Sequence, residues 1–186
     1  MIVPENVLAI THHFIEKAVF PGDRVIDATM GNGHDTLFLS RLVGENGKVF
    51  AFDIQQQALD STKKLLEKEE AKNCELILSG HEKMEEFVDE EVAAVMFNLG
   101  YLPGGDHSVG TLADTTIKAL ESAMKLIKTG GVITVGVYYG GDSGFDEKNR
   151  VMEYIAGIDF KKFTVLTLDY KNRPNCPPIA VVIEKL

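Results

Sequence analysis

Two acidic residues, each at the end of a short apolar run, form the clearest chemical pattern in the chain. Asp27 ends the first run and is followed by the tight turn Gly31-Asn32-Gly33. Asp53 ends the second run, 20 residues beyond the turn. Glycine lets the backbone approach a ligand closely, and an acid at this spacing accepts hydrogen bonds from ribose hydroxyls. The pattern predicts a site for an adenosine-containing cofactor at the carboxyl edge of a parallel sheet.

The acids around the turn indicate which cofactor binds. The loop reads Gly-x-Gly-x-x-Thr, so it lacks the third glycine of the dinucleotide fingerprint. Asp27 and Asp35 bracket the turn; carboxylates repel a pyrophosphate but attract the sulfonium and ammonium groups of S-adenosylmethionine. S-adenosylmethionine is therefore the predicted cofactor, with both acids at its site. The alternatives are a nicotinamide oxidoreductase, for which the chain has no Tyr-x-x-x-Lys dyad, and a plain strand–turn–helix with a solvated Asp53.

The turn is expected to hold the methionine portion of the cofactor. Gly31 and Gly33 bring the backbone against it, and Asn32 and Asp35 are placed to bond its amino and carboxylate groups. For Asn32 the plainer alternative is a turn-forming residue.

Residues after the second and third predicted strands are expected to contact the nucleoside. Asp53 takes both ribose hydroxyls, and Gln55 reaches the same sugar or simply starts a helix. Ser79-Gly80-His81 ends the third strand, at the usual place of adenine contacts. His81 either contacts the base or ribose or caps the following helix, and the sequence favours neither.

The loop after the fourth predicted strand is the predicted substrate site. Asn98-Leu99-Gly100-Tyr101 resembles, in its first and fourth positions, the Asn/Asp-Pro-Pro-Tyr motif of amino-group methyltransferases. There the Asn side chain and nearby carbonyls accept hydrogen bonds from an amine and aim its lone pair at the sulfonium, while the aromatic ring stacks on the planar group. Asn98 and Tyr101 are the predicted catalytic residues; the alternative is a glycine-rich turn with Tyr101 packed on the core. Asp106 and His107 in the same loop are interpreted as solvated or capping residues.

Apolar and amphipathic segments alternate along the chain and predict an α/β fold. The segments are a helix over 5–18, strands over 24–28, 48–53, 74–78, 92–97, 131–138, 162–170 and 178–184, and helices over 34–43, 56–69, 82–88, 110–128 and 146–156. Strands joined by helical crossovers form a parallel buried sheet, whereas the last two, joined too closely for a crossover, form an antiparallel pair. This is the seven-stranded, Rossmann-like plan of class I methyltransferases. No repeat or linker interrupts 1–186, so one domain is expected, with residues 1–20 packed on it; His12 and His13 are interpreted as structural or as part of the substrate rim.

The composition and the spacing of the cysteines indicate the cellular compartment. The chain is 45% hydrophobic and 25% charged, as in ordinary globular proteins. No apolar run approaches the roughly 20 residues of a membrane span, and the start lacks the pattern of a signal peptide. Cys74 and Cys176 are far apart and there is no Cys-x-x-Cys, so no metal site is expected. No membrane role is expected either, and the cysteine content is typical of a protein in the reducing cytoplasm.

The net charge of −9 argues against tight binding of nucleic acid over a broad surface, because counterion release requires many Lys and Arg contacts to phosphates. It leaves room for a local basic patch. Four cations on or beside the last predicted hairpin are the predicted phosphate contacts, enlarged in a symmetric homodimer: Lys161, Lys162, Lys171 and Arg173. The alternative is that they keep an exposed hairpin soluble.

Three segments together, 27–36, 51–55 and 97–106, resemble one small bacterial family. It comprises the tRNA 5-aminomethyl-2-thiouridine methyltransferases of Gram-positive bacteria, long labelled "putative rRNA methylases". The resemblance covers nearly the whole chain, including an Asn-x-Pro-Pro-like turn at 175–178.

The resemblance implies methyl transfer from S-adenosylmethionine to the amine of the wobble uridine in a tRNA anticodon stem-loop. It implies cofactor binding by Asn32, Asp35, Asp53, Gln55, Gly80 and His81. Family members commonly have Ser at position 80, so here only the backbone remains for contact. Desolvation beside a sulfonium disfavours the ammonium form of the amine, so no general base is required. The alternatives are methylation of rRNA or of a small amine, and a cofactor-binding module without catalysis.

Overall fold

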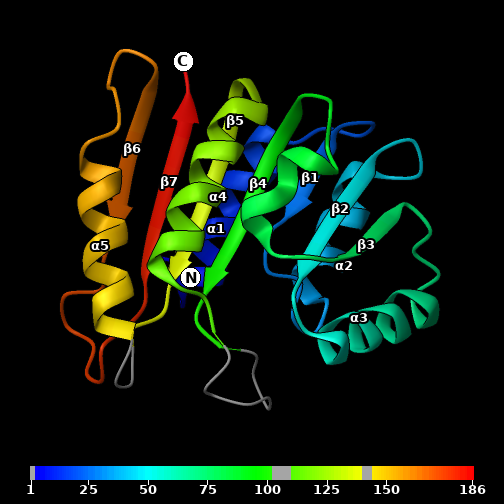
Figure 1. The fold of residues 1–186 in the computed structure, drawn as a ribbon, viewed down its shortest axis with the longest axis horizontal. Coiled ribbons are helices and arrows are strands. Elements are labelled where there is room, and N and C mark those ends of the chain that lie inside the picture. The colour runs from blue at the N-terminus through cyan, green and yellow to red at the C-terminus, as the bar shows by residue number, and fades with distance from the viewer. Residues whose placement is uncertain (1–2, 102–109, 140–143) are drawn as a thin grey trace.

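The computed structural model describes residues 3–101, 110–139 and 144–186, and Figure 1 shows their arrangement. Within these residues seven strands form one sheet, in the order β3-β2-β1-β4-β5-β7-β6. The strands are β1 (Arg24–Asp27), β2 (Lys48–Asp53), β3 (Cys74–Leu78), β4 (Val92–Leu99), β5 (Ile127–Val137), β6 (Phe163–Leu168) and β7 (Ile179–Lys185). The helices are α1 (Val7–Ala18), α2 (His34–Val43), α3 (Gln56–Lys68), α4 (Ala113–Leu126), α5 (Gly144–Ala156) and the short 3-10 helix η1 (His81–Glu86).

The strand directions confirm the predicted fold class. Neighbouring strands from β3 to β5 pair in parallel. β7 pairs antiparallel with both β5 and β6, so β6 again runs in the direction of β5. The result is the expected mostly parallel sheet with an antiparallel C-terminal hairpin.

Helices cover both faces of the sheet. One core cluster joins η1, α4 and α5 to one face, through residues such as Met84, Leu120 and Val151. A second joins α1 and α2 to the other face, through Ile15 and Leu39. In Figure 1, α4 and α5 lie in front of the sheet and α1 and α2 lie behind it. Coverage of both faces explains why the strands read as continuous apolar runs.

Alternation along β4 decides which face each of its side chains reaches. Val95, Phe97 and Leu99 belong to the cluster under α4, whereas Ala94 and Met96 belong to the cluster under α1 and α2. Because successive side chains of a strand point to opposite faces, Asn98 lies on the face of α1 and α2.

β4 is longer than the predicted strand 92–97. Asn98 and Leu99 still pair with Gly136 and Val137 of β5, so the strand continues through Leu99. The prediction that Asn98 belongs to a loop is therefore wrong. The position of Asn98 is fixed by sheet pairing.

The N-terminal helix is attached to the C-terminal hairpin. The Asn6 side chain caps α1 by accepting a hydrogen bond from the Ala9 amide at 2.9 Å. The Tyr170 hydroxyl donates to the Pro4 carbonyl at 2.6 Å, and the Arg173 guanidinium, stacked on the Tyr170 ring, donates to the Glu5 carbonyl. These contacts position α1 at the carboxyl edge of the sheet.

Candidate active site

The glycine turn after β1 has the conformation that its sequence predicts. Gly31 and Gly33 both have positive φ, +50° and +83°, which side chains disfavour. A Cβ at Gly33 would also lie 2.9 Å from the Thr62 Cα of α3. The Thr62 hydroxyl donates to the Gly31 carbonyl at 3.0 Å. Gly33 is thus required both by its backbone conformation and by the close approach of α3.

Asp53 connects this turn to the start of α3. One carboxylate oxygen accepts the Gly31 amide at 3.1 Å and the other accepts the Gln55 amide at 2.9 Å. Each carboxylate oxygen has two acceptor sites, so Asp53 retains capacity for ribose hydroxyls. Gln55 lies at the N-cap of α3 without capping it through its side chain. The ribose roles of both residues stay predictions.

Asp27 is buried at the end of β1 without exposed surface. It accepts hydrogen bonds from the Thr36 hydroxyl at 2.6 Å and the Thr29 amide at 3.2 Å. Burial, and then the charge of Asp35, raise the pKa of Asp27 from 3.8 to about 7. The carboxylate does not reach the surface in this arrangement, and the place of Asp27 at the cofactor site stays a prediction.

Asp35, in the first turn of α2, joins two other elements. One oxygen lies 2.7 Å from Nε2 of His12 on α1, and the other accepts the Nδ2 of Asn98 on β4 at 2.7 Å. The His12 ring lies flat on Phe38, with centroids 3.8 Å apart. The structure therefore brings together the predicted residues Asp35 and Asn98. It adds His12, whose sequence context gave no sign of this contact across 23 residues.

Asn98 carries an unsatisfied acceptor. Its backbone amide donates to the Thr29 hydroxyl at 2.8 Å, whereas its side-chain Oδ1 is buried and receives no hydrogen bond from the described residues. This oxygen lies over Gly136, where a Cβ would be 2.9 Å from it and 3.3 Å from the Tyr138 ring. Buried polar atoms are normally hydrogen-bonded, so Oδ1 is an acceptor that lacks its usual donor among the described residues.

Tyr101 follows β4 and lies at the surface, with 47% of its area exposed. It pairs with Gly110 through an isolated antiparallel bridge. The alternative of Tyr101 packed in the core is therefore wrong, and its predicted contact with substrate is not tested by this arrangement. Asp106 and His107 lie outside the described residues.

His81 is buried at the start of η1. Its Nδ1 lies 3.1 Å from the Ala28 carbonyl, which can only accept, so Nδ1 carries the proton and Nε2 is an acceptor. Burial lowers the pKa of His81 and keeps the ring neutral. Gly80 is the N-cap residue of η1 and no side chain caps it. The alternative that His81 caps the helix is therefore wrong.

Two apolar residues near Asp53 were missed by the sequence analysis. Ile54 follows β2 and is 59% exposed, and Leu78 ends β3, pairs with Asp53 and is 50% exposed. Exposed apolar side chains beside the acid that is predicted to bind ribose suit the flat face of a purine. They were missed because apolar residues at strand ends are normally core residues.

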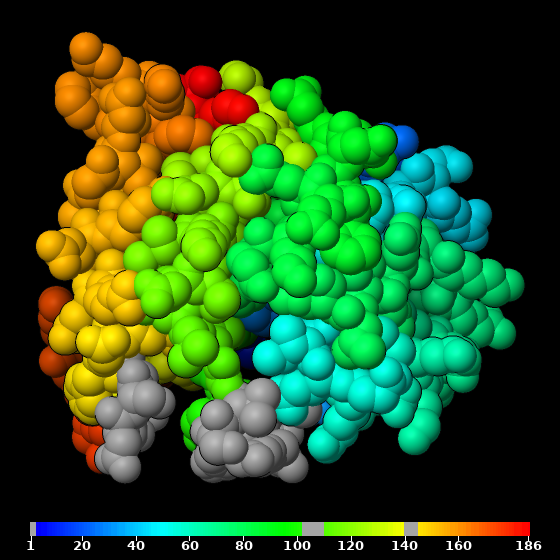
Figure 2. Space-filling view, viewed as in Figure 1, coloured from blue at the N-terminus to red at the C-terminus, as the bar shows by residue number. Residues whose placement is uncertain are grey.

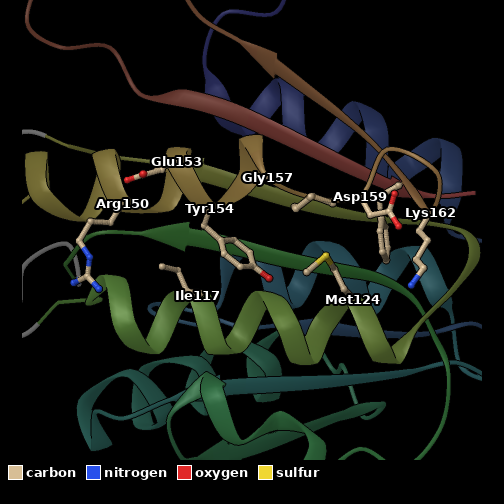
Figure 3. A pocket seen from close by; sticks show the side chains of 10 residues that line it. Ile117, Met124, Arg150, Glu153, Tyr154, Gly157, Asp159 and Lys162 are labelled. Carbon is tan, nitrogen blue, oxygen red and sulfur yellow. The ribbon is translucent and has the colours of Figure 1, made fainter.

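The molecular surface is hollowed beside the β2–α3 segment (Figure 2). Figure 2 shows dark blue atoms of the N-terminal part of the chain between green atoms near α4 and cyan atoms of the β2–α3 segment. The hollow lies toward the end of the sheet where β4 and β5 terminate. A different groove, of about 650 Å³, lies between α4 and α5 (Figure 3). Its lining includes Met124, Tyr154 and Lys162, of which Lys162 is a predicted phosphate contact, but it contains no residue of the predicted cofactor or catalytic site.

Comparison with known proteins identifies the family. The model of the family described as "Putative rRNA methylase" matches residues 49–184. The chain belongs to this family. A model of protein-L-isoaspartate(D-aspartate) O-methyltransferases also matches residues 2–87.

Three relatives support the assignment over the full length of the chain. A "tRNA (mnm(5)s(2)U34)-methyltransferase, chloroplastic" of Arabidopsis thaliana is 38% identical over 95% of this chain and 68% of that protein. A "putative rRNA-methylase" from Clostridium thermocellum is 53% identical, with a TM-score of 0.98 over 100% of both chains. A "putative methyltransferase" from Streptococcus mutans in complex with SAH is 40% identical, with a TM-score of 0.91 over 99% of this chain and 100% of that one.

This family membership confirms the resemblance and the cofactor. Members of the family are class I methyltransferases, and S-adenosylmethionine is the methyl donor of this enzyme. In residues 3–101, 110–139 and 144–186, no helix is long and apolar enough to cross a membrane. Within the same residues, no three His, Cys, Asp or Glu side chains are grouped to hold a metal ion.

The four predicted phosphate contacts do not form one patch. Lys161 and Lys162 precede β6, whereas Lys171 and Arg173 follow it. The six residues of β6 span about 20 Å at 3.3 Å per residue. Leu168 and Val137 pair with neighbouring residues of β7, so only Lys171 and Arg173 lie at the carboxyl edge. The prediction of a single cluster is wrong.

Proposed function

We propose that this enzyme transfers the methyl group of S-adenosylmethionine to the amine of 5-aminomethyl-2-thiouridine at the wobble position of a tRNA. The observation that carries the proposal is the unsatisfied Asn98 Oδ1, an acceptor held at the carboxyl end of β4. An amine N–H is a donor that such an oxygen can accept from. The name of the chloroplastic relative supplies the tRNA position.

The reaction is an in-line displacement. The ammonium first loses a proton to water, which the desolvated site favours. The nitrogen lone pair then forms a bond to the methyl carbon while the carbon–sulfur bond breaks and its electrons remain on sulfur. The products are S-adenosylhomocysteine and a secondary ammonium. Asn98 orients the amine and Tyr101 stacks on the uracil ring, so catalysis rests on positioning rather than on a covalent intermediate.

Three acidic residues of the site favour S-adenosylmethionine as the methyl donor. Asp27, Asp35 and Asp53 interact electrostatically across the turn, and the charges of Asp35 and Asp53 both raise the pKa of Asp27. A sulfonium and an ammonium placed among these carboxylates would relieve their mutual repulsion. S-adenosylhomocysteine lacks the sulfonium charge, so the product is held less strongly by the same acids.

The anticodon stem-loop is the proposed partner. Lys171 and Arg173 lie at the carboxyl edge and offer contacts to its phosphates. A splayed wobble base can enter a pocket, as bases of single-stranded loops do when proteins recognise them. We place this function in the cytoplasm and in one domain comprising residues 1–186. A homodimer would supply a second pair of these cations to one RNA.

A transfer assay with matched substrates tests the proposal. The enzyme is incubated with isotopically labelled S-adenosylmethionine and anticodon stem-loops that carry either 5-aminomethyl-2-thiouridine or uridine at the wobble position. Label in the first RNA alone supports the proposal, and nucleoside mass spectrometry of a deletion strain should show the unmethylated amine. Transfer to rRNA, or equally fast transfer to a simple alkyl amine, would contradict the proposed substrate and assign that molecule as the substrate instead.

A further inference from the structure

A continuous chain of hydrogen bonds joins the N-terminal helix to the proposed substrate acceptor. His12 of α1, Asp35 of α2 and Asn98 of β4 form two contacts of 2.7 Å each. α1 and α2 pack on the same face of the sheet, and Asn98 of β4 lies on that face. Asp35 is the middle residue of this series of hydrogen bonds. Its side chain is 13% exposed and that of His12 is 28% exposed.

The chemistry of Asp35 determines how the Asn98 amide is turned. A carboxylate only accepts hydrogen bonds, so the end of the amide that faces it must be the NH₂ group. The Asn98 oxygen is consequently left for another donor, as observed. If the amide were reversed, an N–H donor would face the substrate amine and compete for its lone pair.

His12 in turn determines the position of Asp35. Its Nε2 must carry the proton toward the carboxylate, and the ring is held by its parallel stack on Phe38 at 3.8 Å. Without this donor, one oxygen of a largely buried carboxylate would lose its partner. Turning toward solvent would then hydrate the Asp35 carboxylate and move it away from Asp27, whose pKa the charge of Asp35 raises.

We propose that His12 is a positioning residue for methyl transfer, which acts through Asp35 to hold the Asn98 amide with its oxygen available to the substrate amine. The inference rests on the proposed function, since it presumes that Asn98 binds the amine. His12 itself contacts neither cofactor nor substrate in this account. Because Asp35 also belongs to the predicted cofactor site, the effect of His12 on the rate of transfer is measured with S-adenosylmethionine saturating.

A double-mutant cycle between His12 and Asn98 tests this role. The variants are His12→Phe, which keeps a ring to stack on Phe38, Asn98→Ala and the double mutant. Single-turnover methyl transfer is measured with saturating S-adenosylmethionine and saturating stem-loop carrying 5-aminomethyl-2-thiouridine. His12→Phe should slow transfer about tenfold, the scale of one hydrogen bond to a charged group. In the Asn98→Ala background the same change should have almost no further effect.

Two further variants separate positioning from folding. His12→Gln places an amide N–H near the position of Nε2 and should restore most of the rate. Glu16→Gln is the control, because Glu16 is exposed on the same helix; this variant should transfer at the wild-type rate. Calorimetry of each His12 variant gives the S-adenosylmethionine concentration that saturates it, so that a change in cofactor affinity does not enter the measured rate.

The outcomes distinguish this inference from the function on which it rests. Additive losses in the double mutant, or a His12→Gln enzyme as slow as His12→Phe, would each overturn the role of His12 alone. A wild-type enzyme that methylates no aminomethyluridine RNA would overturn the proposed function and this inference with it.

Discussion

The Nδ2 atom of Asn98 donates to Asp35 at 2.7 Å, although the two residues lie 63 positions apart in the chain. Asp35 belongs to the predicted cofactor site and Asn98 to the predicted substrate site. Their contact means that the two halves of the site share one carboxylate. A substitution at this contact is therefore expected to affect both the binding of the methyl donor and the transfer to the substrate. A substitution farther from the contact should affect one of the two.

Asp53→Ala should weaken S-adenosylmethionine binding by about 1–3 kcal/mol, because ribose hydroxyls would lose an acceptor. The Gly31 and Gln55 amides would lose the same partner. Titration calorimetry measures the change, with Asp60→Ala as control, since Asp60 is exposed on α3 and bonded to Gln56. Unchanged affinity in the Asp53 variant would remove the ribose assignment.

Tyr101→Ala should lower turnover while leaving cofactor affinity nearly intact. A base stacked on an aromatic ring loses about 1–3 kcal/mol when the ring is removed, which corresponds to roughly 5- to 150-fold. Tyr101→Phe keeps the ring and should retain most of the activity. A Tyr101→Ala protein that loses cofactor binding and melts at lower temperature would assign Tyr101 to the fold instead.

Gly136→Ala should block access to the substrate acceptor. A Cβ at this position would lie 2.9 Å from Asn98 Oδ1 and 3.3 Å from the Tyr138 ring, so one of them must move. We expect methyl transfer to fall about tenfold or more, on the scale of one lost hydrogen bond. Gly157→Ala is the control, since its Cβ would make only ordinary contacts, the nearest at 3.4 Å. Equal rates for the two variants would contradict the proposed path of the amine.

The parts of this site that could be predicted are those encoded locally. The positive φ of Gly31 and Gly33 and the acid at the end of β2 follow from a few adjacent residues, and alternating apolar segments fix the sheet. The link from His12 to Asp35 depends on how α1 packs beside α2, which no local spacing encodes. The face reached by Asn98 depended on whether β4 continued past Phe97, and strand ends are the least predictable boundaries.

The affinity for S-adenosylmethionine should rise with pH between about 6 and 8. Asp27, with its pKa raised to about 7 by burial and by Asp35, is protonated in part of the free enzyme at pH 7. A bound sulfonium favours the ionised form, so binding releases a proton and strengthens as pH approaches and passes 7. Calorimetry in buffers of different ionisation enthalpy measures this proton. Asp27→Asn should abolish the dependence, and S-adenosylhomocysteine should show less of it; an equal slope for both ligands would contradict the role of the sulfonium.

Charge reversal at the carboxyl edge should weaken RNA binding selectively. Lys171→Glu with Arg173→Glu removes the two cations that follow β6 on the side of the active site, so the Michaelis constant for tRNA should rise while cofactor affinity is kept. The log of tRNA affinity should also depend less steeply on the log of salt, by about 0.7 for each lost contact with a single strand.

The control is Lys161→Glu with Lys162→Glu, the same change of charge about 20 Å away along β6. Because Arg173 also donates to the Glu5 carbonyl and stacks on Tyr170, melting temperatures must be compared. If both double mutants raise the Michaelis constant equally, the net charge of the protein and not this edge governs RNA binding.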